Sequence, residues 1–380
     1  MTVCSVCVFS DDKFDIQFDE QGVCSICNQI ESLKHQYGTG QTKGIEAFDA
    51  IVADIKRDGK NKEYDCVIGV SGGTDSSFLM LKAKELGLRP LAVHYDNTWN
   101  KSVATQNIRK VTQTLDIDLY THVVDAKEHD GIKLAYLRSG VQEFDTDTDL
   151  GFVQLLRQVA AKYKIRYILE GHSFLEEGIS PARDNYFDGG YIKDVVKRYG
   201  AVKLSTYPLM NFFQFLKWLI IYRQKFIRPL WYIDYSKSEA RQKLASRTGW
   251  ENYEGHHLEN RASEFAHTVW IPLRYETDYR VLTLASQVRN GKLGRKEALA
   301  ILDSPIERNE ELIEYVCKRT GITVAEFDKM LTAPKRNWRE FKTYKKRFER
   351  LRPLFYLFAK ANMVPMSFYL KYCFPIEKKK

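Results

Sequence analysis

The chain has 380 residues, which is enough to bury a large core and to build two or three structural units. Its charge is balanced, with 28% charged residues, and this excludes an intrinsically disordered chain. The net charge of +9 comes from the end of the chain, because residues 331–380 hold 14 Lys or Arg and 3 Asp or Glu, whereas the other 330 residues hold 44 and 46. The nearly neutral body lacks the basic face that is typical of nucleic-acid enzymes.

Signals for export or membrane insertion are missing from the sequence. No basic region followed by an apolar one opens the chain, and no apolar run reaches the roughly 18–20 residues of a membrane-spanning helix. The longest candidates, residues 212–222 and 354–370, are interrupted by Lys217, and by Lys360 and Pro365. We therefore expect a cytoplasmic protein, at most peripheral to the inner membrane.

Four of the seven cysteines form two C-x2-C pairs, at Cys4 and Cys7 and at Cys24 and Cys27. Each pair places two thiolates on one side of a turn, and two such knuckles complete a tetrahedral sulfur site for Zn²⁺. Two disulfides would suit an exported chain, and an iron–sulfur cluster also takes four thiolates. We predict a structural zinc knuckle over residues 1–35.

An α/β pattern follows the cysteines. Residues 30–57 are expected to form a polar connector and a short helix. Between residues 60 and 205, short apolar runs then alternate with helical patterns. The strands are expected at 64–70, 91–96, 118–124 and 167–171. The helices are expected after the first strand and near 101–115, 127–138 and 150–164. This alternation predicts an α/β domain with a doubly wound parallel sheet, which binds ligands at the carboxyl ends of its strands.

The alternation stops near residue 206. Residues 206–333 are expected to form a helical lid or substrate wall, starting with an aromatic helix over 208–228. Ser236-Lys237-Ser238-Glu239 has the form of a capping box that opens another helix. Further helices are expected near 295–303 and 308–332.

Residues 334–380 form a basic, aromatic tail. A solvated basic helix followed by a helix packed on the body would explain its composition. Attachment to anionic lipid is the alternative with a functional meaning, because basic groups and aromatic anchors act together at a membrane surface. Docking of a partner protein is a third interpretation.

The loop after the first strand carries the clearest chemistry, with the sequence Ser71-Gly72-Gly73-Thr74-Asp75-Ser76-Ser77. A loop at a helix start can direct several backbone N–H groups at one phosphate, and glycines let the backbone come close. The three serines add hydroxyl donors, and Asp75 can hold Mg²⁺ or cap the helix. The loop lacks the lysine and the spacing of a Walker P-loop, so γ-phosphoryl transfer is not expected. Ser-Gly-Gly alone is a common turn, but the flanking strand and helix make the full motif specific.

The motif SGGxDS resembles the PP-loop of the N-type ATP pyrophosphatases, which are adenine nucleotide alpha hydrolase-like. The resemblance implies that ATP is cleaved between its α- and β-phosphates, with Ser71 and Asp75 at the phosphates. It places His94, Asp96 and Asn97 beside the adenosine. It places Gly171 and His172 near the α-phosphate, where His172 would have a catalytic role. A His172 that only bonds to backbone at a strand end is an equally open interpretation.

Missing residues narrow the choice of enzyme within this superfamily. No cysteine lies on a G-x-C-x-G turn, and residue 2 is Thr, so neither type of glutaminase is present in this chain. A tRNA-modifying thiolase is the alternative function, but it would have only Cys66, Cys317 and Cys373 available, and the neutral body argues against a tRNA face. An inactive zinc scaffold is a third class.

Longer segments resemble the N-acetyl sugar amidotransferases of the WbpG/PseA-like type, which act in surface-polysaccharide synthesis. These segments begin with the cysteine pairs and Phe18-Asp19-Glu20-Gln21-Gly22, and include the runs 64–73 and 91–100. They continue with Ile233-Asp234-Tyr235, Gly249-Trp250, Gly255-His256-His257-x-Glu259 and Gly294-Arg295-Lys296-Glu297-Ala298-Leu299. The resemblance covers about residues 1–330.

This resemblance implies an ATP- and Mg²⁺-dependent amidotransferase of LPS O-antigen or related glycan synthesis. An acetamido group of a nucleotide-linked N-acetyl sugar would become an acetamidino group through an O-adenylyl imidate. The ammonia would come from a glutaminase and cyclase pair that resembles the subunits of imidazole glycerol phosphate synthase. No nucleic-acid partner is expected.

His256, His257 and Glu259 are candidates for substrate contact or proton transfer, because histidine titrates near neutral pH. They are equally compatible with a polar loop after Gly255. A sugar that carries a uronate would need cationic contacts, for which Arg183, Lys193 and Arg261 are candidates.

Overall fold

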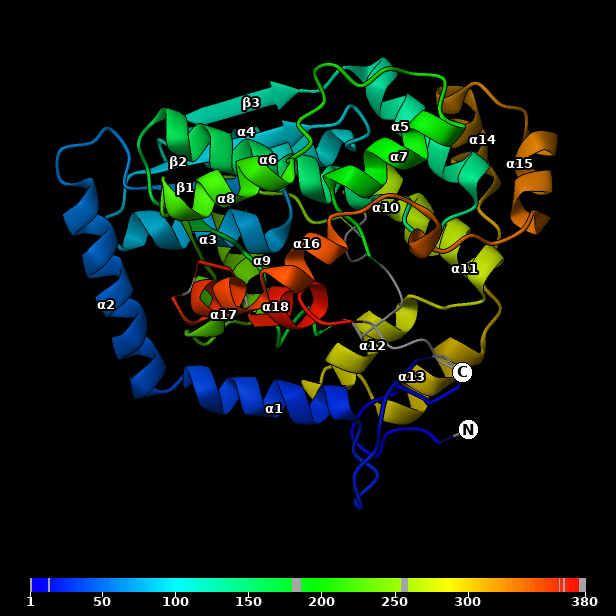
Figure 1. Cartoon of the computed structure of the whole chain (residues 1–380). Coiled ribbons are helices and arrows are strands. Elements are labelled where there is room, and N and C mark those ends of the chain that lie inside the picture. Colours follow the sequence, from blue (N-terminus) through cyan, green and yellow to red (C-terminus); the bar gives the residue numbers. More distant parts are fainter. Residues whose placement is uncertain are drawn as a thin grey trace.

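The computed structural model describes residues 2–12, 14–179, 186–253, 259–361, 363–364 and 366–375. At its centre is a five-stranded parallel sheet, which is covered by helices on both faces (Figure 1). The strands are β1 (Cys66–Val70), β2 (Pro90–Asp96), β3 (Leu119–Val123), β4 (Tyr167–Leu169) and β5 (Lys225–Ile227). They lie in the order β3-β2-β1-β4-β5. The predicted α/β class with a doubly wound parallel sheet is confirmed.

The winding direction of the sheet reverses at β1. Strands β2 and β3 extend the sheet on one side of β1, while β4 and β5 extend it on the other. The carboxyl ends of β1 and β4 therefore border a topological switch point, which is where open α/β sheets bind ligands. The pairing of Val70 with His94 brings the end of β2 to the same place.

Successive strand residues point into two different cores. Val67 and Val93 pack into one core, whereas Ile68 and Ala92 pack into the other. The first core includes α5 (Ala126–Ser139), α6 (Thr146–Lys162) and α7 (Gly189–Tyr199). The second includes α2 (Thr42–Gly59), α3 (Thr74–Glu85), α4 (Ser102–Thr114) and α9 (Lys237–Thr248). Burial on both faces explains why these strands are continuous apolar runs.

The region between the cysteines and the sheet is more helical than expected. Instead of a connector and a short helix over 30–57, the chain forms α1 (Ser25–Tyr37) and the 18-residue α2. In α2, Phe48, Val52 and Ile55 recur at helical spacing and are buried against the sheet. The polar residues between them lie on the solvated face, so the apolar stripe and not the overall polarity determines the helix.

The expected helix over 208–228 is wrong in its second half. The helix α8 (Phe212–Ile220) ends early, Arg223 has the left-handed φ of 49°, and residues 225–227 form β5. Strand β5 pairs in parallel with β4, through Ile168 and Phe226 at its centre. Its formation depends on this tertiary pairing, which overrides the local helical pattern. The sheet therefore gains a strand from the region that was expected to be purely helical.

The predicted capping box at Ser236 is also wrong, although the helix α9 that it was expected to open is present. Ser236 is the N-cap residue, but its side chain makes no cap hydrogen bond. Its hydroxyl oxygen lies 2.9 Å from that of Ser238. The two hydroxyls satisfy each other instead of the helix amides.

Helices dominate the rest of the chain. They are α10 (Arg261–Phe265), α11 (Ile271–Tyr275), α12 (Arg280–Arg289), α13 (Arg295–Asp303), α14 (Glu310–Thr320), α15 (Val324–Thr332), α16 (Lys345–Arg350), α17 (Arg352–Lys360) and α18 (Met366–Tyr372). A π-helical turn over Ala266–Trp270 joins α10 to α11, and short 3₁₀ turns lie at Pro229–Trp231 and Trp338–Glu340. Among the described residues, no helix has both the length and the apolar character required to cross a bilayer.

The N-terminal knuckle packs beside α12 and α13 (Figure 1). Its cysteines share a core with Val281, Leu284 and Ala298 of those helices and with Phe174, which follows β4. Arg295 donates hydrogen bonds to the carbonyl oxygens of Cys4 and Cys7. The knuckle therefore connects the C-terminal helices to the loop at the end of β4.

Candidate active site

The glycine loop lies between β1 and α3, where its backbone is held in one conformation. Gly72 has a φ of +83°, and a Cβ added to it would lie 2.2 Å from the carbonyl oxygen of Ala104. No other residue type fits this position. The Gly72 carbonyl oxygen accepts hydrogen bonds from Trp250 Nε1 at 3.0 Å and from Asn107 Nδ2 at 3.4 Å. Gly73 is the N-cap of α3, so the loop passes directly into a helix N-terminus.

The predicted hydroxyl donors of the loop have different environments. Ser76 Oγ accepts from the Ser71 amide at 3.3 Å and donates to the Gly73 carbonyl oxygen at 3.4 Å. Ser71 Oγ accepts from the Gly73 amide at 3.4 Å, and Ser71 lines a cavity. Ser77 is fully buried, and its hydroxyl has no partner among the described residues. Of the three serines, Ser71 is the one that lines the cavity.

Asp75 forms a buried polar cluster that joins α3 to the start of α9. One carboxylate oxygen accepts from Lys237 Nζ at 2.8 Å, and the other accepts a short hydrogen bond from the Tyr235 hydroxyl. The side chains of Asp75 and Lys237 are only 13% and 18% exposed. Asp75 therefore does not cap α3, since its carboxylate is engaged by an ion pair that was not predicted.

Electrostatics couple this cluster to Glu177. Burial disfavours the charged form of Asp75, but the Lys237 ammonium outweighs it and lowers the pKa of Asp75 below its usual range. For Glu177, burial and the neighbouring Asp75 carboxylate both raise the pKa well above its usual value. Burial would lower the pKa of Lys237, but Asp75 and Glu177 raise it. In this cluster the Lys237 ammonium favours the ionised form of Asp75, while burial and the Asp75 carboxylate favour the protonated form of Glu177.

The predicted pair Gly171 and His172 lies beside the glycine loop. A Cβ on Gly171 would lie 2.9 Å from the backbone nitrogen of Ser76, so only glycine allows this close approach. His172 Nδ1 accepts from Trp231 Nε1 at 3.2 Å, and its Nε2 lies 3.6 Å from Glu177 Oε2. The two segments meet because β1 and β4 are neighbours in the sheet.

At the end of β2, the residues expected beside an adenosine lie along the same edge. His94 is 4% exposed, and its Nδ1 lies 3.2 Å from the Val70 carbonyl oxygen. Its Nε2 has no partner in the described part of the chain, and burial lowers the pKa of His94. Asp96 accepts from the Thr98 amide at 2.8 Å, while Asn97 accepts from Asn260 Nδ2 at the same distance. Asp96 and Asn97 thus stabilise the turn that follows β2.

A cavity of about 1480 Å³ opens at this edge of the sheet. It exceeds the roughly 300–1,000 Å³ of ordinary ligand pockets. It extends from the glycine loop to α12 and to the tail. The residues that line it include Ser71, His94, Asn97, His172 and Glu177. The cavity has room for a nucleotide together with a second substrate.

The candidate substrate residues are only partly within the described chain. His256, His257 and Arg183 lie outside the described residues. Glu259 lines the cavity and accepts from the Tyr253 hydroxyl at 3.2 Å. A Cβ on Gly73 would lie 3.6 Å from a Glu259 carboxylate oxygen, so Glu259 borders the glycine loop.

The proposed cationic contacts lie in other surroundings. Lys193 borders a smaller cavity between α7 and the tail, and the Arg261 guanidinium stacks over the Tyr315 ring at 4.4 Å. The arginines that line the large cavity are Arg228 and Arg280. Nothing in their local sequence distinguishes them from other surface arginines.

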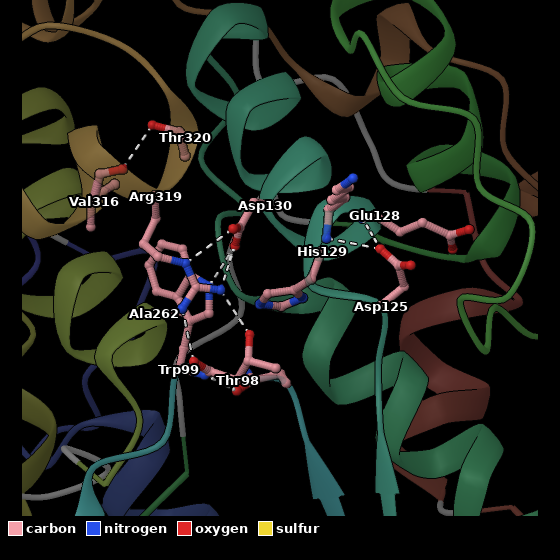
Figure 2. Close-up of polar contacts among 12 residues, drawn as sticks. Thr98, Trp99, Asp125, Glu128, His129, Asp130, Ala262, Val316, Arg319 and Thr320 are labelled. Carbon is pink, nitrogen blue, oxygen red and sulfur yellow. Dashed lines mark hydrogen bonds and ion pairs between the residues drawn. The ribbon is translucent and has the colours of Figure 1, made fainter.

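The C-terminal helices hold the turn after β2 in place (Figure 2). Arg319 of α14 donates to both carboxylate oxygens of Asp130, at 2.8 and 3.0 Å, and to the carbonyl oxygen of Thr98 at 2.8 Å. Trp99 Nε1 donates to the same Asp130 at 2.8 Å, and the Arg319 guanidinium lies 5.0 Å from the Trp99 ring. Thr98 has a positive φ of 65°, so this contact stabilises an unfavourable backbone conformation. No local pattern predicts a contact across more than 200 residues.

The four cysteines have the geometry of a site for a single metal ion. Their sulfur atoms lie within 4.8 Å of one another, with Cys4 and Cys27 3.9 Å apart and Cys7 and Cys24 3.7 Å apart. A tetrahedral ion with bonds of about 2.3 Å has its sulfurs about 3.8 Å apart. Backbone amides donate to the sulfurs, as at Cys24 to Cys4 at 3.3 Å, which favours thiolates. The set fits one Zn²⁺ better than an iron–sulfur cluster, which needs more widely separated sulfurs.

Comparisons with known proteins match parts of the chain. Residues 259–352 match the family model of the C-terminal domain of WbpG-like LPS biosynthesis proteins. An uncharacterized protein of Methanocaldococcus jannaschii is 31% identical over 118 residues, which span 30% of this chain and 40% of that relative.

Solved structures show weaker similarity. NMN synthetase from Francisella tularensis is similar over 73% of this chain and 92% of its own, with 16% identity and a TM-score of 0.36. A predicted subunit of a tRNA methyltransferase from M. jannaschii is similar over 47% of this chain and 75% of its own, with 14% identity and a TM-score of 0.26. The assignment of the fold therefore rests on the strand order and the glycine loop.

Proposed function

We propose that the chain is an ATP-dependent amidotransferase of surface-glycan synthesis, a proposal supported by the match of residues 259–352 to the family model of WbpG-like LPS biosynthesis proteins. It converts the acetamido group of a nucleotide-linked N-acetyl sugar into an acetamidino group. One observation carries the ATP-dependent step of this proposal. The glycine loop, through Ser71, and the loop with His172 and Glu177 meet at one edge of a large cavity, and the Asp75–Lys237 pair lies next to Glu177.

The first step activates the amide. The acetamido oxygen attacks the α-phosphorus of ATP, the bond between the α- and β-phosphates breaks, and pyrophosphate leaves. The loop amides and the N-terminus of α3 stabilise the negative charge on the phosphates. Lys237 lies within reach of the same loop and offsets the charge of the departing pyrophosphate once Asp75 engages a cation.

Two carboxyl groups provide a place for that cation. Asp75 and Glu177 are buried next to each other, and oxygen ligands of this kind suit Mg²⁺. Bound there, Mg²⁺ would neutralise charge on the phosphates. Cation binding would also favour the ionised form of Glu177, which His172 Nε2 faces at 3.6 Å.

The second step replaces AMP by ammonia. Ammonia attacks the imidate carbon, AMP leaves with the former acetamido oxygen, and a proton is lost to give the amidine. No cysteine of the sequence lies on a G-x-C-x-G turn, and we infer that a separate glutaminase and cyclase pair provides the ammonia. The tRNA-modifying alternative has no support at the cavity, since no cysteine is among the described residues that line it.

The reaction is tested with ATP, Mg²⁺, heavy-nitrogen ammonium and a panel of nucleotide-linked diacetamido sugars. We expect AMP, pyrophosphate and a sugar that contains the heavy nitrogen, detected by high-resolution mass spectrometry. Asp75→Ala should abolish pyrophosphate release in protein that circular dichroism shows to be folded at the assay temperature, although loss of the buried ion pair lowers its stability. Asp49→Ala, at an exposed position of α2, is the matched control. Formation of ADP in place of AMP, or nitrogen transfer to tRNA, would refute the proposal.

A further inference from the structure

The basic tail packs on the body through an aromatic core that it shares with α8 (Figure 1). Phe215 of α8 stacks on Phe355 of α17 with ring centroids 6.0 Å apart. Phe212 contacts Phe348 of α16 at 5.2 Å. The tail is therefore part of the folded protein, as the first interpretation of its sequence requires.

Large apolar side chains are exposed on the outer sides of α8 and α17. Phe213 and Ile221 of the α8 segment are 73% and 68% exposed, and Leu357 of α17 is 63% exposed. Ile220 and Tyr356 are also exposed. Exposed large apolar side chains on neighbouring helices are typical of a surface that binds a membrane or another protein.

The charges around these side chains are almost all positive. Residues 210–223 and 343–374 together contain nine Lys or Arg, and Glu349 is their only acidic residue. The Arg347 guanidinium lies 5.8 Å from the centroid of the exposed Phe213 ring. Within the described residues, neither Lys217 nor Arg350 forms an ion pair. These cations are available to an anionic partner.

We propose that the exposed sides of α8, α16 and α17 form a surface that docks on an anionic lipid bilayer. The apolar side chains insert at the level of the headgroups, and the basic side chains bind the lipid phosphates. Aromatic and aliphatic groups interspersed with free cations favour a bilayer over an acidic protein, which would present its carboxylates in fixed positions.

Docking through this surface would also hold the large cavity at a fixed position relative to the bilayer. Ala359, Val364 and Leu370 of the tail line the large cavity, so the tail separates that cavity from the docking surface. The docking surface itself takes no part in the chemistry, so its test is independent of the proposed reaction.

The test is sedimentation of the full chain with vesicles of phosphatidylglycerol and phosphatidylcholine, against vesicles of phosphatidylcholine alone. We expect binding to the anionic vesicles only, weakened by salt. Ile221→Asp with Leu357→Asp should lower the apparent affinity by roughly 30-fold or more. Lys217→Gln with Arg350→Gln should lower it less and reduce the salt dependence.

The matched control is Ile45→Asp, because Ile45 is 45% exposed on α2, away from this surface. The control should bind vesicles like the wild type. All variants should keep wild-type melting temperatures and ATP-dependent pyrophosphate release in the absence of lipid. The proposal is overturned if the wild type stays in the supernatant with every vesicle, or if the Ile221→Asp and Leu357→Asp variant sediments like the control.

Discussion

Replacing Lys237 by Met removes the cation from the Asp75 cluster and keeps the length of the side chain. Lys237 Nζ lies 2.8 Å from Asp75 Oδ2, and both side chains are mostly buried. The remaining Asp75 carboxylate keeps the hydroxyl of Tyr235 as a donor and has Glu177, whose pKa burial and Asp75 raise, beside it. The variant therefore tests one contact in a cluster whose other members stay in place.

The cost follows from the environment of the pair. Loss of one partner of a buried ion pair destabilises a protein by about 3–5 kcal/mol, because a buried charge stays behind. Here Asp75 can relax by taking up a proton, so we expect the lower end, about 3 kcal/mol, in urea unfolding at pH 7. Pyrophosphate release should fall by roughly 10²–10³-fold, as for other charge-stabilising groups.

The sign of the pH dependence gives a second check. Lys237 lowers the pKa of Asp75 in the folded protein. The ionised Asp75 therefore stabilises the folded state at any pH above the carboxyl pKa of the unfolded chain, and this stability is lost as the pH falls through the pKa of the folded state. The deficit of Lys237→Met should therefore be largest at neutral pH and shrink below about pH 4.

The matched control is Lys243→Met in the same helix. Lys243 pairs with Glu85 at 2.7 Å, but its side chain is 37% exposed, so its loss should cost less than about 1 kcal/mol. The reasoning is refuted if Lys237→Met behaves like Lys243→Met in both assays. A deficit that grows on acidification would refute it as well.

Three further predictions address other parts of the molecule. Cys24→Ser should abolish zinc binding, measured by elemental analysis, and lower the melting temperature, because the knuckle shares a core with α12 and α13. Arg319→Ala should raise the KM for ATP by roughly tenfold with a smaller change in kcat, because the turn after β2 loses its clamp. Burial raises the pKa of Glu143 from 4.5 to about 7. The protonated Glu143 favours the folded state, so this stability is fully present below about pH 4.5 and is lost as the pH rises through 7. The free energy of unfolding of the wild type should fall by about 3 kcal/mol between these pH values, and Glu143→Gln should remove this fall. Urea titrations at pH 5 and pH 8 measure both.

The sheet could be predicted because its signals are local. Each of the strands β1 to β4 is a short apolar run next to a helical pattern, and the structure places each within two residues of its expected position. Strand β5 has no such signal. Its three residues follow an aromatic helix without a turn motif, and only the free edge of β4 makes them a strand.

The half of the site that lies on the sheet was predictable for the same reason. Gly72 and Gly171 are glycines because backbone from another segment lies within about 3 Å of where a Cβ would be. Such close contacts can be inferred from the sequence, because they require glycine. The role of Lys237 cannot be inferred in this way, since its position after Ser236 suggests only the first turn of a helix. Its ion pair with Asp75 spans 162 residues.

The C-terminal helices complete the site and do not merely cover it. The segment that matches the family model begins at Glu259, and its first residues bind the turn after β2: the Lys101 amide donates to the Glu259 carbonyl oxygen at 2.9 Å, and the Arg261 amide donates to that of Trp99 at the same distance. Phe265 and Trp270 belong to the same core as Val93 of the sheet. A domain that contributes backbone hydrogen bonds to the turn after β2 and shares the core of the sheet cannot move as a rigid lid without breaking both sets of contacts.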